Sequence, residues 1–219
     1  MNVFAAVPVK DLMNAKQRLI PALTTDQRQR LAQAMLEDVL RALGAALAGA
    51  VHVVTTDAEV MDLARRHGAA CLVESADRGH TEAVAFAQQQ ARARGAERFL
   101  TIPGDVPCVT AAEVTRALAA LGDERGVLFV PSLSGFGTNG ALLAPPDIMA
   151  LKFGEPSFDN HLEAARQRGL SPVVLDLPGL GLDIDAPEDL VLLLERGPET
   201  RSAALLREWG LSACHPAFP

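Results

Sequence analysis

The chain has 219 residues and a mass of 23.2 kDa, a size that one α/β domain can fill with its own core. Hydrophobic residues make up 49% and charged residues 21%, which excludes a disordered chain or a coiled coil. The net charge of −7 argues against a nucleic-acid partner, because clustered Lys and Arg bind phosphate backbones. The start, MNVFAAVPVK, reaches Lys10 too soon for a signal peptide or a membrane helix. We therefore expect a cytoplasmic protein with no membrane partner.

Short apolar runs rich in β-branched residues alternate with helical patterns along the chain. The runs expected to form strands are 3–9, 51–56, 69–73, 98–102, 127–130, 141–145 and 172–177. The expected helices are 24–47, 58–68, 80–94, 111–121, 157–169 and 187–195. This alternation predicts a single-domain α/β fold with a doubly wound, mostly parallel sheet. We expect this domain to span 1–197, with a C-terminal helix and tail, 198–219, packed on it.

The stretch GFGTNG, residues 135–140, matches the dinucleotide-binding pattern G-x-G-x-x-G. That pattern carries the function only between a strand and a helix, because the helix N-terminus binds the pyrophosphate. Here the apolar run ALLAPP follows, and its two prolines prevent a useful helix. The stretch is therefore predicted to be a Gly-rich turn between two strands, with Thr138 and Asn139 at its tip.

A cluster of cations follows the first predicted strand. Lys10, Lys16 and Arg18 lie within nine positions of one another, where ligands bind at the carboxyl ends of the strands of an open α/β sheet. Three cations in one loop could clamp a triphosphate and stabilise a transferring phosphoryl group. A solvated basic loop is the alternative interpretation.

Acidic residues follow two other predicted elements. Asp105 comes directly after a strand, where it could bind Mg²⁺, although Gly-Asp is also common in plain turns. Asp183 and Asp185 flank Ile184, so in an extended segment only one of them can point toward a given face. Asp185 could bind the metal, act as the N-cap of the helix that follows, or do both.

The fourth segment of interest precedes the predicted helix 157–169. Ser157 stands where that helix begins, and the backbone N–H groups of a helix N-terminus, together with a hydroxyl, can bind a phosphate. Gly154 would let the backbone approach a ligand closely. The alternative is that Ser157 is an ordinary N-cap.

Taken together, these segments resemble a known family from Val7 to about Leu194. The matching segments are, in order, VPVKDLMNAKQRL, IPGDVP, GTNGALL, KFGEPSFDNHLEAA and LDIDAPEDL. This combination resembles the 2-phospho-L-lactate guanylyltransferases of coenzyme F420 biosynthesis. The resemblance implies a nucleotidyltransferase fold of the nucleotide-diphospho-sugar transferase type. It also implies transfer of GMP from GTP to 2-phospho-L-lactate, phosphoenolpyruvate or 3-phospho-D-glycerate, with release of pyrophosphate.

The resemblance also implies roles for individual residues. Catalytic roles fall to Lys16, Arg18 and Asp105, and Mg²⁺ ligation to Asp105 and Asp185. Nucleotide contacts fall to Lys10, Gly79, His80, Thr81, Pro103 and Gly104. Acceptor contacts fall to Thr138, Asn139, Gly154 and Ser157. One departure concerns Gly79-His80-Thr81, which stands where the family usually has Gly-Leu-Asn, so base or acceptor preference could differ here.

Two other functions stay open. An enzyme of the same fold could use CTP or another phosphorylated acceptor, but such enzymes usually carry a Gly-rich loop after the first strand, which VPVKDLMNAKQRL lacks. A non-catalytic nucleotide-binding protein is the second, and Lys16, Asp105 and Asp185 speak against it. The sequence does not choose among the three acceptors, which differ by a few atoms. It also leaves the oligomeric state open, with a homodimer as one option.

Overall fold

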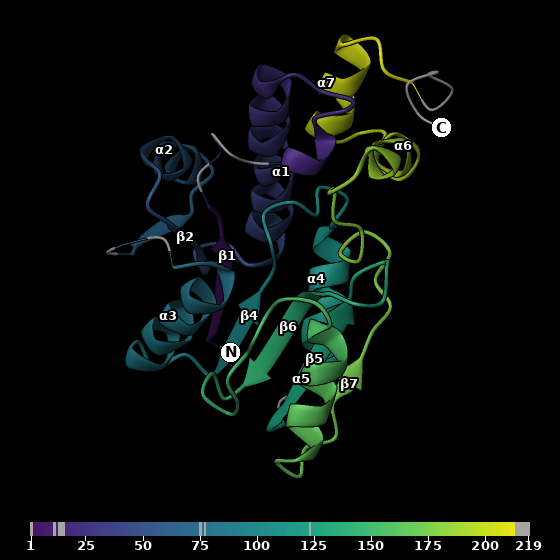
Figure 1. Ribbon diagram of the computed structural model, residues 1–219. Coiled ribbons are helices and arrows are strands. Elements are labelled where there is room, and N and C mark those ends of the chain that lie inside the picture. Colours follow the sequence, from purple (N-terminus) through teal and green to yellow (C-terminus); the bar gives the residue numbers. More distant parts are fainter. Residues whose placement is uncertain are drawn as a thin grey trace.

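A computed structural model describes residues 2–10, 12, 16–74, 76, 78–122 and 124–212 (Figure 1). Its strands are β1 (Val3–Pro8), β2 (Val51–Thr55), β3 (Ala70–Val73), β4 (Arg98–Thr101), β5 (Gly126–Pro131), β6 (Thr138–Ala144) and β7 (Val173–Val174). Its helices are the 3₁₀ turn η1 (Gln17–Leu19), α1 (Thr25–Ala46), α2 (Ala58–Arg66), α3 (His80–Ala93), α4 (Ala111–Leu121), α5 (Ser157–Arg166), α6 (Pro187–Arg196) and α7 (Arg201–Glu208).

The strands within these described ranges form one seven-stranded sheet in the order β3-β2-β1-β4-β6-β5-β7. Only β6 runs antiparallel to its neighbours β4 and β5, and every other pairing is parallel. The prediction of a single-domain, mostly parallel α/β sheet is confirmed. The last strand is shorter than predicted, because only Val173 and Val174 of the segment 172–177 are in register with β5, and Leu175 adds one hydrogen bond to Phe129 O.

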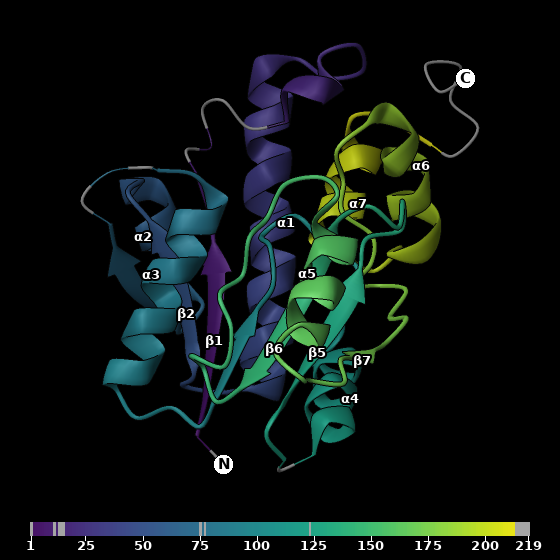
Figure 2. The same ribbon diagram turned by 60° about the horizontal axis from the view of Figure 1, so that its bottom comes forward.

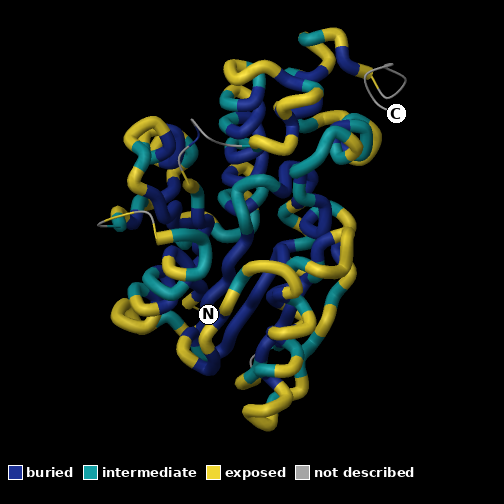
Figure 3. Tube along the Cα trace, viewed as in Figure 1, coloured by how far each residue is buried: buried dark blue, intermediate teal, exposed yellow. Residues whose placement is uncertain are grey.

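Helices cover both faces of the sheet, as Figure 2 shows for α3 and α5 on one side and α1 on the other. The face of α1 that carries Leu31, Met35 and Val39 is fully buried against the sheet. A capping box begins this helix, because Thr24 and Gln27 bond reciprocally. Figure 3 shows the central strands as the most buried part of the molecule, so polar side chains reach solvent mainly at the strand ends.

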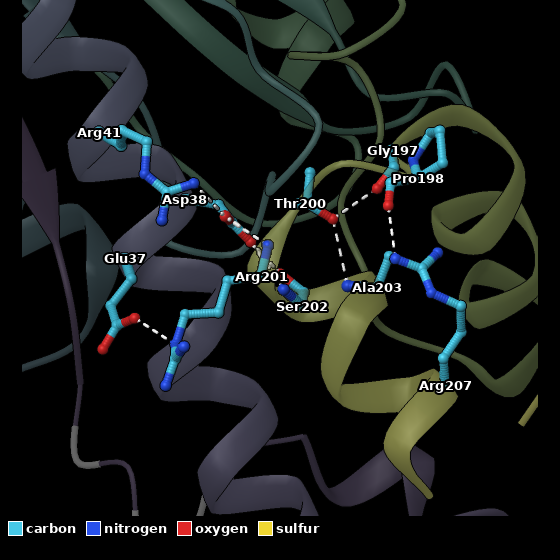
Figure 4. A network of polar contacts seen from close by, with 10 residues as sticks. All are labelled: Glu37, Asp38, Arg41, Gly197, Pro198, Thr200, Arg201, Ser202, Ala203 and Arg207. Atoms are coloured by element: carbon cyan, nitrogen blue, oxygen red, sulfur yellow. Dashed lines mark hydrogen bonds and ion pairs between the residues drawn. The ribbon is translucent and has the colours of Figure 1, made fainter. Parts of the chain in front are cut away.

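The C-terminal helix α7 packs on α1 through a buried carboxylate (Figure 4). Asp38 of α1 accepts hydrogen bonds from the backbone N–H groups of Arg201 and Ser202, both at 2.9 Å, and from the Ser202 hydroxyl. Thr200 caps the same helix by accepting from the Ala203 N–H. Residues 213–219 of the predicted tail lie outside the described residues. No helix in the described part of the chain is long and apolar enough to cross a membrane.

Candidate active site

A cleft of about 580 Å³ opens at the carboxyl ends of β1 and β4. These two strands are parallel neighbours, so the loops that follow them meet at the same edge of the sheet. The cleft is also lined by α1, the start of α3 and the segment before α6. The predicted site residues that line it are Lys10, Lys16, Arg18, His80, Pro103, Gly104, Asp105 and Asp185. The cations after β1 and the two metal-ligand candidates therefore share one cleft.

Lys16 connects the two acidic residues of the cleft. Its Nζ lies 2.6 Å from Oδ2 of Asp105 and 2.8 Å from Oδ1 of Asp185. The lysine side chain is only 9% exposed, whereas the two carboxylates are 32% and 44% exposed. Lys16 itself has a φ of 58°, a left-handed conformation that is uncommon for a non-glycine residue. The carboxylates thus face the cleft, and a strained backbone position holds the ammonium between them.

The charges of this ion-pair cluster stabilise one another. Burial favours neutral Lys16, but the two carboxylates more than compensate and raise the pKa of this lysine above its ordinary value. Burial likewise works to raise the pKa of Asp105, yet the Lys16 charge and hydrogen bond hold that pKa below its ordinary value. Both groups are therefore charged at neutral pH.

The structure separates the roles of Asp183 and Asp185. Asp183 accepts a hydrogen bond from Nδ2 of Asn139 at 3.0 Å, and its pKa is raised by burial and by the charges of Asp105 and Asp185. Asp185 is not the N-cap of α6, because its side chain turns to Lys16. That cap is Ala186, and the N–H groups of both 185 and 186 donate to Asp189 instead.

The predicted placement of Thr138 and Asn139 at the tip of a turn is wrong. Both residues belong to β6 and are buried, because the hairpin has already closed where Pro131 pairs with Thr138. The exposed tip of the hairpin is formed by 133–136. The Asn139 amide donates hydrogen bonds to Gly181 O and Asp183, so it connects β6 to the segment that carries Asp183 and Asp185. The prediction that GFGTNG joins two strands rather than opening a helix is correct.

Thr138 and Ser157, predicted to act together, lie in contact. Ser157 Oγ is 3.3 Å from Thr138 Oγ1, and both side chains are buried. Ser157 is the first residue of α5 rather than its N-cap, which is Pro156. The nearby Gly154 has a φ of 113°, a conformation suited to glycine.

Sequence reasoning missed His161, which completes this group. It is 2% exposed, and its Nδ1 lies 2.9 Å from Thr138 Oγ1. Its spacing of four residues from Ser157 places both on one face of α5, and this spacing was the available signal. Sequence reasoning gave the His no role because its partner Thr138 belongs to a distant strand.

The segment Gly79-His80-Thr81 begins α3 beside the cleft. Gly79 is the N-cap, with a φ of 96°, and the ring of His80 lines the cleft. That ring meets Phe153 edge to face, with 4.5 Å between the ring centroids, and burial lowers the pKa of His80. Thr81 Oγ1 accepts from the Phe153 N–H at 3.0 Å. His80 and Thr81 thus both contact Phe153 in the loop that leads to Gly154.

The arrangement of the sheet and helices is shared with solved structures of other proteins. The structure resembles a crystal structure of a putative nucleotide-diphospho-sugar transferase from Desulfovibrio desulfuricans G20, with a TM-score of 0.77 over 95% of each chain at 20% identity. At that identity the likeness shows the fold, which is that of the nucleotidyltransferases.

The sequence comparisons give the family. The model of the family described as "Guanylyl transferase CofC like" matches residues 3–216. A phosphoenolpyruvate guanylyltransferase of Sphaerobacter thermophilus is 40% identical, covering 90% of this chain and 95% of its own. A 2-phospho-L-lactate guanylyltransferase of Methanothermobacter thermautotrophicus is 34% identical, with coverage of 95% and 91%. The chain belongs to the CofC-like guanylyl transferase family, as the resemblance of its motifs implied.

Proposed function

We propose that this protein transfers GMP from GTP to the phosphate of a small phospho-acid and releases pyrophosphate, as a step of coenzyme F420 biosynthesis. The observation that carries the proposal is the convergence of Lys16, Asp105 and Asp185 in the cleft of a chain of this family. The relatives support a phospho-acid acceptor, since their names specify phosphoenolpyruvate or 2-phospho-L-lactate. A GTP-dependent reaction also favours the cytoplasm as its location.

The donor set of the cleft suits Mg²⁺. Asp105 and Asp185 each bring a carboxylate oxygen to within 2.8 Å of one point, the Lys16 nitrogen, so a cation already lies between them. Among the described residues no group of three or more His, Cys, Asp or Glu side chains could hold a metal. Two carboxylates are what Mg²⁺ takes from a protein when phosphate and water supply its other ligands. Bound there, the ion would neutralise charge on the triphosphate.

The cations of the cleft have a complementary role. Lys10 and Arg18 are exposed on the cleft wall, where they can bind the β- and γ-phosphates. If the two carboxylates held Mg²⁺, the Lys16 ammonium would be free to bind the same phosphates from its place in the cleft. An oxygen of the acceptor phosphate then attacks the α-phosphorus of GTP in line. The new P–O bond forms as the bond to the β-phosphate oxygen breaks, and pyrophosphate leaves with that electron pair.

No strong general base is needed, because the attacking phosphate is already an anion. The protein's contribution is therefore positioning and electrostatic stabilisation. For the acceptor we propose Thr138, Gly154 and Ser157, which come from β6, the loop before α5 and the start of α5. They lie on the α5 side of the sheet, and Phe153 links them to His80 in the cleft.

A matrix of pyrophosphate-release assays tests the function. Each of four nucleoside triphosphates is combined with 2-phospho-L-lactate, phosphoenolpyruvate and 3-phospho-D-glycerate, with and without Mg²⁺. We expect release with GTP, with one acid preferred, and only with Mg²⁺. Equal rates with CTP would favour the same-fold alternative. No release in any well, with GTP still bound, would favour a non-catalytic nucleotide-binding protein.

A further inference from the structure

His161 is buried away from the cleft, yet both of its ring nitrogens are engaged. Nε2 lies 3.0 Å from the backbone nitrogen of Lys152, which can only donate. Nδ1 lies 2.9 Å from Thr138 Oγ1. Burial lowers the pKa of His161 to about 4, so the imidazole is neutral at physiological pH. A neutral imidazole has one donor and one acceptor nitrogen. Because Nε2 must accept from Lys152, Nδ1 carries the proton and donates to Thr138.

This assignment determines the role of the Thr138 hydroxyl. A hydroxyl oxygen has two acceptor lone pairs and one proton to donate. One lone pair accepts from His161 Nδ1–H, and the other accepts from Ser157 Oγ–H at 3.3 Å. With both lone pairs used, Thr138 can make its remaining hydrogen bond only as a donor. The partner that this hydroxyl can take is therefore a hydrogen-bond acceptor, such as an oxygen of a phosphate or carboxylate, and not a group that only donates.

Two aromatic contacts and a hydrogen bond fix the orientation of the His161 imidazole. It stacks on Phe129, with 5.3 Å between centroids and 11° between planes. It meets Phe153 edge to face, at 5.2 Å and 72°. Its bond to Lys152 also fixes the start of the loop that carries Gly154. One side chain therefore orients both the strand and the loop that supply the proposed acceptor contacts.

We propose that His161 is a positioning residue that makes Thr138 a one-way hydrogen-bond donor to the anionic acceptor. The proposal rests on the proposed function for the identity of that anion. It deepens that function by explaining how Thr138 favours an acceptor oxygen, such as that of a phosphate or carboxylate, over a group that only donates hydrogen bonds. His161 touches neither substrate in this assignment and acts only through Thr138 and the loop before α5.

Two substitutions of His161 separate positioning from packing. His161→Leu fills the space but removes both hydrogen bonds, whereas His161→Asn keeps an amide N–H near the position of Nδ1. We expect His161→Leu to raise the acceptor KM about tenfold or more, because one hydrogen bond to a group that binds an anion is lost. The KM for GTP should stay within about twofold. His161→Asn should recover most of the acceptor affinity. Equal damage by both substitutions, or a matching rise in the GTP KM, would overturn the proposal.

A double substitution tests whether His161 acts through Thr138. Thr138→Val removes the hydroxyl that the imidazole orients, so adding His161→Leu should cost little more in acceptor KM than Thr138→Val alone. Independent, multiplying effects would contradict the proposal. Thermal unfolding of each variant shows whether a loss of acceptor binding follows from a loss of structure.

A spectroscopic test does not depend on activity or on the stability of a variant. Nitrogen-15 chemical shifts of the wild-type His161 ring between pH 6 and 8 report which nitrogen carries the proton. We expect protonated Nδ1 and unprotonated Nε2 throughout. The opposite tautomer would refute the inference even if the guanylyl transfer is confirmed. The expected tautomer in a protein that turns over no phospho-acid would mean that the proposed function has failed and the hydrogen-bond assignment stands.

Discussion

Two acidic clusters of this molecule, one around Asp38 and one formed by Asp105 and Asp185, differ in the groups that stabilise the carboxylate charge. Asp38 of α1 is 3% exposed, accepts from two backbone N–H groups and a hydroxyl of α7, and has Arg41 as an ion-pair partner at 3.6 Å (Figure 4). Asp105 and Asp185 face a cleft and share one charged partner, the side chain of Lys16. A carboxylate bound by fixed backbone groups stabilises the fold, whereas carboxylates that face a cleft beside one lysine are placed to bind a cation in the proposed function.

The largest expected effect breaks the cleft cluster. Asp105→Asn should reduce Mg²⁺-dependent pyrophosphate release by on the order of a thousandfold, because an amide cannot replace the charge that opposes the metal and Lys16. The melting temperature should change little, since the side chain is partly exposed and the substitution creates no cavity. Near wild-type release from the purified variant would show that Asp105 is only a turn residue.

The matched substitution of Asp38 should lower the stability of the fold and leave nucleotide binding unchanged. Asp38→Asn turns an amide NH₂ group toward backbone donors, so at least one buried N–H loses its acceptor. We expect a loss of about 2 to 4 kcal/mol in the free energy of unfolding, measured in urea, with an unchanged KM for GTP at low temperature. A loss of activity in a variant that keeps wild-type stability would mean that α7 contributes to the cleft.

These two clusters also show which parts of the structure could be predicted from the sequence and which could not. Asp105 and Lys16 follow predicted strands, so the rule that ligands bind at strand ends found them. Asp38 lies inside a long helix, and nothing local indicates that α7, more than 160 residues later, supplies its donors. His161 was missed for the same reason, because its partner lies on β6. Thr138 was identified from its motif. Its burial depends on where the β5–β6 hairpin closes, and the glycines of this segment do not determine that position.

His161 provides a third case, a buried titratable group that stays uncharged. Its pKa is lowered from 6.5 to about 4 in the folded protein. Between these values the unfolded chain binds a proton that the folded chain does not, so its contribution to stability is complete above pH 6.5 and is lost as the pH falls toward 4. From pH 7 to 4.5 wild type should lose roughly 2 to 3 kcal/mol more than His161→Asn, as measured by urea unfolding. Parallel curves for the two proteins would show that His161 does not titrate in this range.

The smallest expected effect concerns Ser157, where a role in orienting Thr138 can be distinguished from direct hydrogen bonding of the Ser157 hydroxyl to the acceptor. Its hydroxyl donates to Thr138 across 3.3 Å, a long and therefore weak hydrogen bond, and Thr138 keeps its bond to His161 when that donor is removed.

Ser157→Ala should therefore raise the acceptor KM only about two- to fivefold, with unfolding free energy unchanged within about 0.5 kcal/mol. Thr138→Val, assayed beside it, should show the larger effect, because it removes the donor that the anion itself would bind. A rise of tens of fold for Ser157→Ala would mean that the Ser157 hydroxyl itself donates to the acceptor, rather than the backbone at the start of α5 alone. Thr138 would then no longer be the principal donor of the proposed acceptor site.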